Sequence, residues 1–434
     1  MRLPSIPRTL GRVPEPVESR PPLSALFLLG GAAQAAMTLP MFTAPFVATA
    51  FGLSDAQVAF VSGVISLGAF GSFALSRLAD RRGRRLVMRL CFAALGPLSL
   101  VTAAAPGVVV YSAAQLVSTA FRGSLASVAV VAITEVTDDD VRARAHGWFG
   151  LVAALASGIP LGLAAGLGEV ESGWRILFAL LGALALALPW VWRRVPETRR
   201  FERSRAGGGE GHGRVRDLLA PAWRRRAVGL VVVGVLRGAG LGALGAYAYF
   251  HAVDNLGQPA WVASAVLGGG GALGLIGNAV GAVLSERWGR RPTQVAGALL
   301  TTLAGVAYYQ VPAGLGVWTP LALALGFTGY VLGIQAFAVA DRLVDTELFP
   351  TRLRGTYAGL RTVGDAAAAT LQNFGLSAAI TALGNLELAI TVLVPAFVLP
   401  ALALFWWVTT ESRGLALDDV AIEQYPRPSA KERP

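Results

Sequence analysis

The sequence has very few of the residues that build disulfides, metal sites and catalytic centres. Its single cysteine, Cys91, excludes an intrachain disulfide and is expected to be a packed thiol within a helix. Only three histidines are present, His146, His212 and His251, and no metal-ligand spacing, nucleotide-binding loop or nucleophile constellation occurs. We therefore expect no enzyme, no metal and no cofactor.

Charged residues are also scarce. They make up 15% of the chain, whereas soluble domains carry roughly 25%. Hydrophobic residues make up 54% and the mean hydropathy is +0.57, so the chain is predicted to be embedded in a lipid bilayer. A spanning helix needs roughly 20 apolar residues, so the chain has room for about twelve such helices with short connections.

The basic residues point to membrane orientation. The net charge of +11 would suggest nucleic acid in a soluble protein, but here the arginines lie between apolar runs, so no nucleic-acid partner is expected. Nearly all of them fall in every second loop and in the termini. The alternate loops, which contain no Lys or Arg, lie near 51–56, 105–108, 168–173, 252–259, 311–317 and 382–387. Both termini are therefore predicted to be cytoplasmic, which requires an even number of helices.

Composition divides the chain into two apolar halves joined by a polar linker. Residues 1–22 are polar and Pro-rich, and the apolar run after them is too long for a cleavable signal peptide. The expected parts are a cytoplasmic N-terminal tail (1–22), a six-helix bundle (23–194), a cytoplasmic linker (195–226), a second six-helix bundle (227–408) and a cytoplasmic C-terminal tail (409–434).

Three motifs occur once in each half. The first is a basic turn, Ser76–Arg85 and Ala282–Arg291, whose acids Asp80 and Glu286 are 206 positions apart. The second is an acid followed seven places later by arginine, and the third closes each half with an acidic stretch. These two motifs comprise Glu135 with Arg142, Glu347 with Arg354, Val195–Thr198 and Thr410–Val420. The repetition indicates two related halves.

Together these motifs resemble the major facilitator superfamily, most closely its sugar-porter and metabolite–proton symporter branches. The resemblance covers about residues 23–420. It implies an all-α, multi-pass protein of the cell membrane, with twelve transmembrane helices in two pseudo-symmetric six-helix bundles that rock around a central site. It also implies a monomer. Ser76 and Ala282 replace the first glycine of the basic turn, and Thr410 replaces a proline, which weakens assignment to the sugar porters proper.

By this resemblance, the repeated charges would form a cytoplasmic gate of surface ion pairs, each worth roughly 0–1 kcal/mol. The alternative is that they only set topology, although acids contribute little to that. The gate candidates are Asp80, Arg81, Arg84, Glu135, Arg142, Glu197, Glu286, Arg287, Arg290, Glu347, Arg354 and Glu411.

Charges within the predicted helices mark a central site, because such charges usually face a cavity or a partner. Arg122 either caps backbone carbonyls or clamps an anion. Arg237 lies about 15 Å into its helix, and no acid lies within one turn of it in the sequence. Two arginines from opposite halves would suit a carboxylate substrate. Neutral hydrogen bonds to the substrate, or links between helices, would come from Gln34, Gln335, Gln372 and Asn373.

Proton coupling needs a titratable group within the membrane. Asp365 is the only clearly intramembrane carboxylate found in the sequence, and Arg361 lies four residues before it, where the two could neutralise each other. Symport would use this pair. Uniport or anion exchange would need no such acid, and these alternatives stay open.

The leading hypothesis is a secondary transporter for a small organic metabolite, anionic in character, moved with or without protons. One alternative is a multidrug or antibiotic exporter of the same fold, for which Gly158–Gly162 is only a partial signature. Another is a non-transporting membrane sensor built on a transporter fold, although the linker and tail look too short for a signalling domain.

The gate hypothesis makes a kinetic prediction. Glu347→Gln or Arg354→Gln is expected to slow transport more than it weakens substrate binding, because gate contacts act on the conformational step. Turnover and affinity measured in reconstituted vesicles would check this. Unchanged turnover would mean that these charges only orient their loop.

Overall fold

The computed structural model describes residues 23–137, 139–168, 170, 172–195, 215–349 and 351–411. Within these ranges the chain is helical and contains no strand, so the predicted all-α class is confirmed. Eleven stretches are long and apolar enough to cross a membrane. With the 20-residue helix α15 (Arg290–Tyr309), the described part of the chain makes twelve passes.

Several passes consist of more than one helix. In the first half the elements are α1 (Leu23–Phe51), α2 (Asp55–Ser66), α3 (Gly68–Arg82), α4 (Arg84–Ala103), α5 (Val108–Val136), α6 (Asp139–Leu167), α7 (Gly173–Gly182), η1 (Ala183–Ala187) and α8 (Leu188–Arg194). In the second half they are α10 (Val215–Leu218), α11 (Pro221–Ala246), α12 (Ala248–Phe250), η2 (His251–Asn255), α13 (Ala260–Gly274), α14 (Gly277–Arg287), α15, η3 (Ala313–Trp318), α16 (Thr319–Glu347), α17 (Thr351–Leu383) and α18 (Leu386–Val408).

The repeated basic turns have the same backbone geometry in both halves. Gly83 and Gly289 separate consecutive helices with φ angles of 106° and 107°. Residues that carry a side chain rarely adopt a positive φ of this size. The turn itself therefore requires the glycine of the motif. We call the end of the molecule that carries these two turns the arginine end, and the other end the opposite end.

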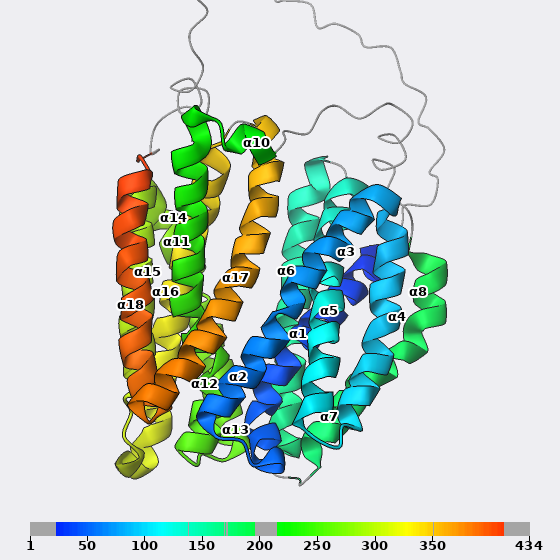
Figure 1. The fold of residues 1–434 in the computed structure, drawn as a ribbon, viewed down its shortest axis with the longest axis vertical. Coiled ribbons are helices and arrows are strands. Elements are labelled where there is room, and N and C mark those ends of the chain that lie inside the picture. Colours follow the sequence, from blue (N-terminus) through cyan, green and yellow to red (C-terminus); the bar gives the residue numbers. More distant parts are fainter. Residues whose placement is uncertain are drawn as a thin grey trace, which may run out of the picture.

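The two halves form separate bundles that lie side by side and diverge toward the arginine end (Figure 1). One buried cluster, around Leu26, Met88 and Phe92, contains only first-half residues. A second cluster, around Trp223 and Phe349, contains only second-half residues. Both clusters lie toward the arginine end, so each bundle has its own core there.

The opposite end has one core shared by both halves. A single buried cluster contains Phe42 of α1, Tyr249 of α12 and Leu376 of α17, and the rings of Phe42 and Tyr249 meet edge to face at 5.5 Å between centroids. Across the same end, the Ser377 hydroxyl donates to the Ala56 carbonyl at 2.8 Å. The molecule is therefore closed at the opposite end in this conformation.

Small residues allow close helix packing in the second half. A β-carbon on Gly281 of α14 would lie 2.5 Å from the carbonyl oxygen of Ala336 in α16, whereas one on Gly269 of α13 would have no heavy atom within 4 Å. Small residues at such contacts let helix backbones approach in membranes.

We therefore expect Gly281→Ala to lower the free energy of unfolding by roughly 1–3 kcal/mol through overpacking. Thermal unfolding of the detergent-purified protein would measure this. Gly269→Ala is the matched control and should leave the melting temperature nearly unchanged. Equal melting temperatures for the two variants would contradict the close approach of α14 and α16.

Candidate functional site

A cavity of about 330 Å³ lies between the two halves. Its wall comes mainly from α1, α2 and α5 of the first half, completed by Tyr247 and by α17 of the second half. Most of the lining is apolar, and it includes the flexible side chains of Met37 and Met41 and the ring of Tyr111. A pocket of this size and character accommodates a small, largely apolar molecule.

Among the described residues that line the cavity, Arg122 of α5 is the one that carries a charge. Its guanidinium donates to the Ala36 carbonyl at 2.8 Å, to Gln115 Oε1 at 3.1 Å and to Thr119 Oγ1 at 2.7 Å. These acceptors are neutral, and in the described part of the chain no ion pair to Arg122 is found. The sequence left two roles open for Arg122, capping backbone carbonyls or clamping an anion. The side chain does bind a carbonyl, and it also borders the cavity where an anion could bind.

The second half contributes neutral polar groups to the same cavity. Gln372 and Asn373, both predicted as binding residues, line it together with Tyr247. The Tyr247 hydroxyl donates to Asn373 Oδ1 at 2.6 Å. The cavity therefore combines one positive charge from the first half with amide and phenol groups from the second.

Arg237 of α11 lies outside the cavity lining and is neutralised. Its two terminal nitrogens contact both carboxylate oxygens of Asp341 in α16, at 3.0 and 3.1 Å. Gln294 of α15 donates to the same carboxylate at 2.8 Å, and Arg361 of α17 also pairs with it. The side chains of Arg237 and Asp341 are only 10% and 11% exposed.

Asp341 corrects one expectation from the sequence, which considered Asp365 the only clearly intramembrane carboxylate. Asp341 falls within the apolar stretch Ala313–Arg342. Asp341 directly precedes Arg342, where the arginine distribution predicts a cytoplasmic loop, and the sequence therefore did not mark it as an intramembrane acid. Arg361 contacts this acid, while Asp365 is exposed. Gln34 and Gln335 are half-buried and do not line the cavity.

Five of the described gate candidates make contacts within their own half. Arg84 pairs with Asp80 at 3.3 Å and with Glu135 at 3.0 Å. Glu411 accepts the backbone N–H groups of Arg290 and Arg291 at 2.8 and 3.0 Å, which satisfies the N-terminus of α15. Arg81, Glu286 and Arg287 are exposed. The side chains of Arg142, Glu197, Glu347 and Arg354 lie outside the described residues.

Comparison with known sequences decides the family. The family model of the Major Facilitator Superfamily matches residues 26–372. The chain belongs to this superfamily. The resemblance drawn from the repeated motifs is thereby confirmed, and the protein is a membrane transporter and not an enzyme.

Curated relatives of this facilitator are transporters of small organic molecules. A probable 4-methylmuconolactone transporter of Cupriavidus pinatubonensis is 27% identical over 91% of this chain and 91% of its own length. The 4-hydroxybenzoate transporter of Pseudomonas aeruginosa is 31% identical over 42% of this chain and 40% of its own length.

Solved structures of other facilitators share the fold. The inward-open xylose transporter of E. coli superposes with a TM-score of 0.70 at 16% identity, covering 93% of this chain and 99% of that one. A bacterial homologue of the human lysosomal transporter Spinster, in an inward-facing conformation, gives a TM-score of 0.65 at 16% identity, over 94% and 98% of the two chains.

The ion pair of Arg237 with Asp341 can be tested by measuring the thermal stability of variants. Asp341→Asn would leave Arg237 buried without its carboxylate, and removing one partner of a buried pair costs roughly 3–5 kcal/mol. We expect a large fall in melting temperature. Asp80→Asn is the matched control, because the Asp80 side chain is 70% exposed in its pair with Arg84, and exposed pairs contribute roughly 0–1 kcal/mol. Equal losses in the two variants would contradict this assignment.

Proposed function

We propose that this facilitator is a secondary transporter of small organic anions that carry a carboxylate on a compact apolar body. The observation that carries the proposal is Arg122, which is the one charged residue among the described residues of a cavity lined otherwise by apolar and neutral polar groups. A charge in such a place is costly and usually faces a partner. The missing partner would be the carboxylate of the substrate.

The geometry of Arg122 supports this role. A guanidinium offers five N–H donors in a fixed fork, and three contacts to neutral acceptors hold this one in place. A side chain fixed in this way is preorganised, and remaining donor capacity can serve a carboxylate. Gln372, Asn373 and Tyr247 would give hydrogen bonds from the second half, so that one substrate would touch both bundles.

The lining also favours a particular shape of substrate. Met37, Met41, Tyr111 and Tyr247 offer apolar and aromatic surface, and methionine adapts well to irregular contacts. A small ring with one carboxylate matches this combination. The relative named for 4-hydroxybenzoate transport is consistent with it, because 4-hydroxybenzoate is such a molecule.

Transport would follow alternating access between the bundles. The separate cores at the arginine end and the shared core at the opposite end describe one of the two required states. With both termini cytoplasmic, as the arginine distribution predicts, this state would face the cytoplasm. Asp365 and Arg361 would serve as coupling residues in the second bundle, and the repeated acids and arginines would tune the gate.

An uncharged sugar is the second candidate substrate, because a xylose transporter shares the fold and a myo-inositol transporter of Cryptococcus neoformans is 28% identical over 36% of this chain and 27% of its own length. A sugar needs hydrogen-bonding partners over most of its surface, whereas most of the residues lining this cavity are apolar. The balance therefore favours a carboxylate.

Arg122→Gln tests the proposal. A hydrogen bond to a charged group contributes roughly 1.5–3 kcal/mol, so we expect 4-hydroxybenzoate to bind about 10- to 150-fold more weakly. Calorimetric titration of the purified protein would measure this. The methyl ester of the same ligand carries no charge and should bind the wild type and the variant alike.

Arg225→Gln is the matched control, because it removes an exposed arginine outside the cavity lining. It should bind 4-hydroxybenzoate as the wild type does. Equal affinity of Arg122→Gln and wild type would refute the anion site. Tight binding of xylose instead would favour the sugar candidate, and tight binding of a lipophilic cation would favour an exporter.

A further inference from the structure

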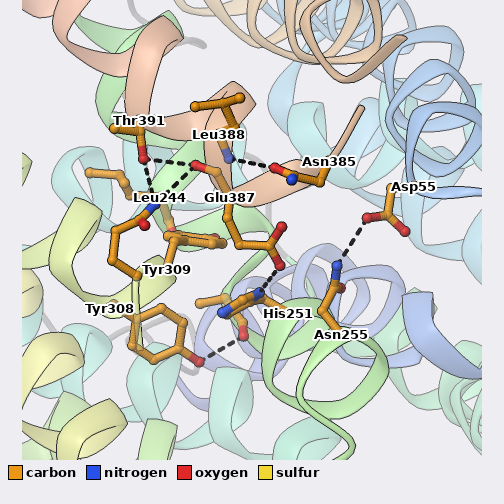
Figure 2. Close-up of polar contacts among 12 residues, drawn as sticks. Asp55, Leu244, His251, Asn255, Tyr308, Tyr309, Asn385, Glu387, Leu388 and Thr391 are labelled. Atoms are coloured by element: carbon orange, nitrogen blue, oxygen red, sulfur yellow. Dashed lines mark hydrogen bonds and ion pairs between the residues drawn. The ribbon is translucent and has the colours of Figure 1, made fainter. Parts of the chain in front are cut away.

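A buried histidine at the opposite end is not explained by the substrate site. His251 begins the π-helical turn η2, and its side chain is fully buried. Its Nδ1 lies 3.3 Å from a carboxylate oxygen of Glu387 in α18, as Figure 2 shows. Among the described residues, neither ring nitrogen has a partner with good hydrogen-bond geometry. A buried imidazole facing a carboxylate is a natural place to hold a proton.

Glu387 is positioned firmly for this contact (Figure 2). It lies in the first turn of α18, where Asn385 caps the helix by accepting the Leu388 N–H at 2.8 Å. The Thr391 hydroxyl donates to the Glu387 carbonyl at 2.7 Å and accepts from Gln310 at the same distance. The carboxylate itself is 28% exposed, so water can reach the pair and exchange a proton with it.

Apart from Glu387, the described groups that flank the imidazole are neutral phenols, and the guanidinium of Arg175, also at this end, is held by the carbonyls of Ala103 and Ala105. Two tyrosines of α15 flank the ring, with centroids 4.8 Å away for Tyr309 and 5.8 Å away for Tyr308. Both hydroxyls donate to backbone carbonyls of α11 and α12, at 2.9 and 2.8 Å. The helices α1 and α13 that also pack here contain no titratable side chain, and the adjoining loops contain no Lys or Arg.

The same π-helical turn carries a contact to the other half. Asn255, four residues after His251, donates to Asp55 of α2 at 3.0 Å (Figure 2). Asp254 lies next to it. Closing the opposite end therefore gathers the acids Asp55, Asp254 and Glu387 from both halves. Like charges repel each other in this setting, and a protonated His251 would offset that repulsion.

We propose that His251 and Glu387 form a proton-binding site that couples protonation to closure of the opposite end. One proton from water binds at the imidazole, and the imidazolium–carboxylate pair holds η2 in the geometry that presents Asn255 to Asp55. Loss of that proton to water weakens the pair, frees the turn and favours opening of this end. This inference rests on the alternating-access transport proposed above and adds a proton site at the opposite end, separate from Asp365 and Arg361.

Distance measurements between two spin labels would test the site. Cys91→Ala removes the only thiol, and Val109→Cys with Ala382→Cys places labels on exposed positions of the two halves at the opposite end. In the wild-type background we expect the distance distribution to shift toward shorter values when the pH is lowered from about 8 to about 5.5, the range in which histidine side chains commonly change charge. His251→Gln and Glu387→Gln should each lose this shift.

His146→Gln is the matched control, because His146 contacts Thr134 near the arginine end at 3.0 Å and should keep the shift. If the His251 variant does not fold, Glu387→Gln still tests the site, because the partly exposed carboxylate is expected to tolerate this substitution. The absence of a shift in the wild-type background, or its persistence in either site variant, would overturn the proposal.

The same labelled protein separates this inference from the proposed function. Addition of 4-hydroxybenzoate at constant pH tests substrate-driven movement. A response to the ligand without a response to pH would overturn the proton site and leave the transport proposal standing. A response to pH that is lost in the site variants, without any response to the ligand, would support the proton site and count against the proposed substrate.

Discussion

A charge in the apolar interior of a membrane protein must find a partner, and this constraint organises the whole molecule. Arg237 meets it within the protein, because Asp341 and Gln294 complete a buried cluster that ties four passes of the second bundle together. Arg122 meets it only with neutral acceptors beside the cavity. The difference between these two arginines is what directs the proposed anion site to the first bundle.

The distribution of buried surface has a similar consequence for movement. Each bundle has its own core at the arginine end, whereas a shared core joins them at the opposite end. The bundles can therefore separate at one end without losing their internal packing. Opening the opposite end, in contrast, must break contacts such as Phe42 with Tyr249 and Asn255 with Asp55. Groups that strengthen or weaken these contacts can therefore shift the equilibrium between the two conformations.

The two halves repeat in sequence but have diverged in chemistry. The glycines of the basic turns, Gly83 and Gly289, keep the same backbone geometry. The first half supplies the single charge of the cavity, while the second half supplies neutral hydrogen-bonding groups, the buried ion-pair cluster and the pair of His251 with Glu387. The proposed functions thus depend on residues that the repeat does not share.

The sequence by itself determined the features that depend on local, periodic signals. Long apolar runs and the glycine turns define the helices, and the duplicated motifs identify the superfamily, because these signals need only neighbouring residues. The partner of Arg237 was decided by tertiary structure, since Asp341 is 104 residues away and only helix packing brings the two together. The same holds for the cavity lining and for the contact of His251 with Glu387. Such pairings depend on how helices rotate and cross, and no local pattern in the chain encodes that.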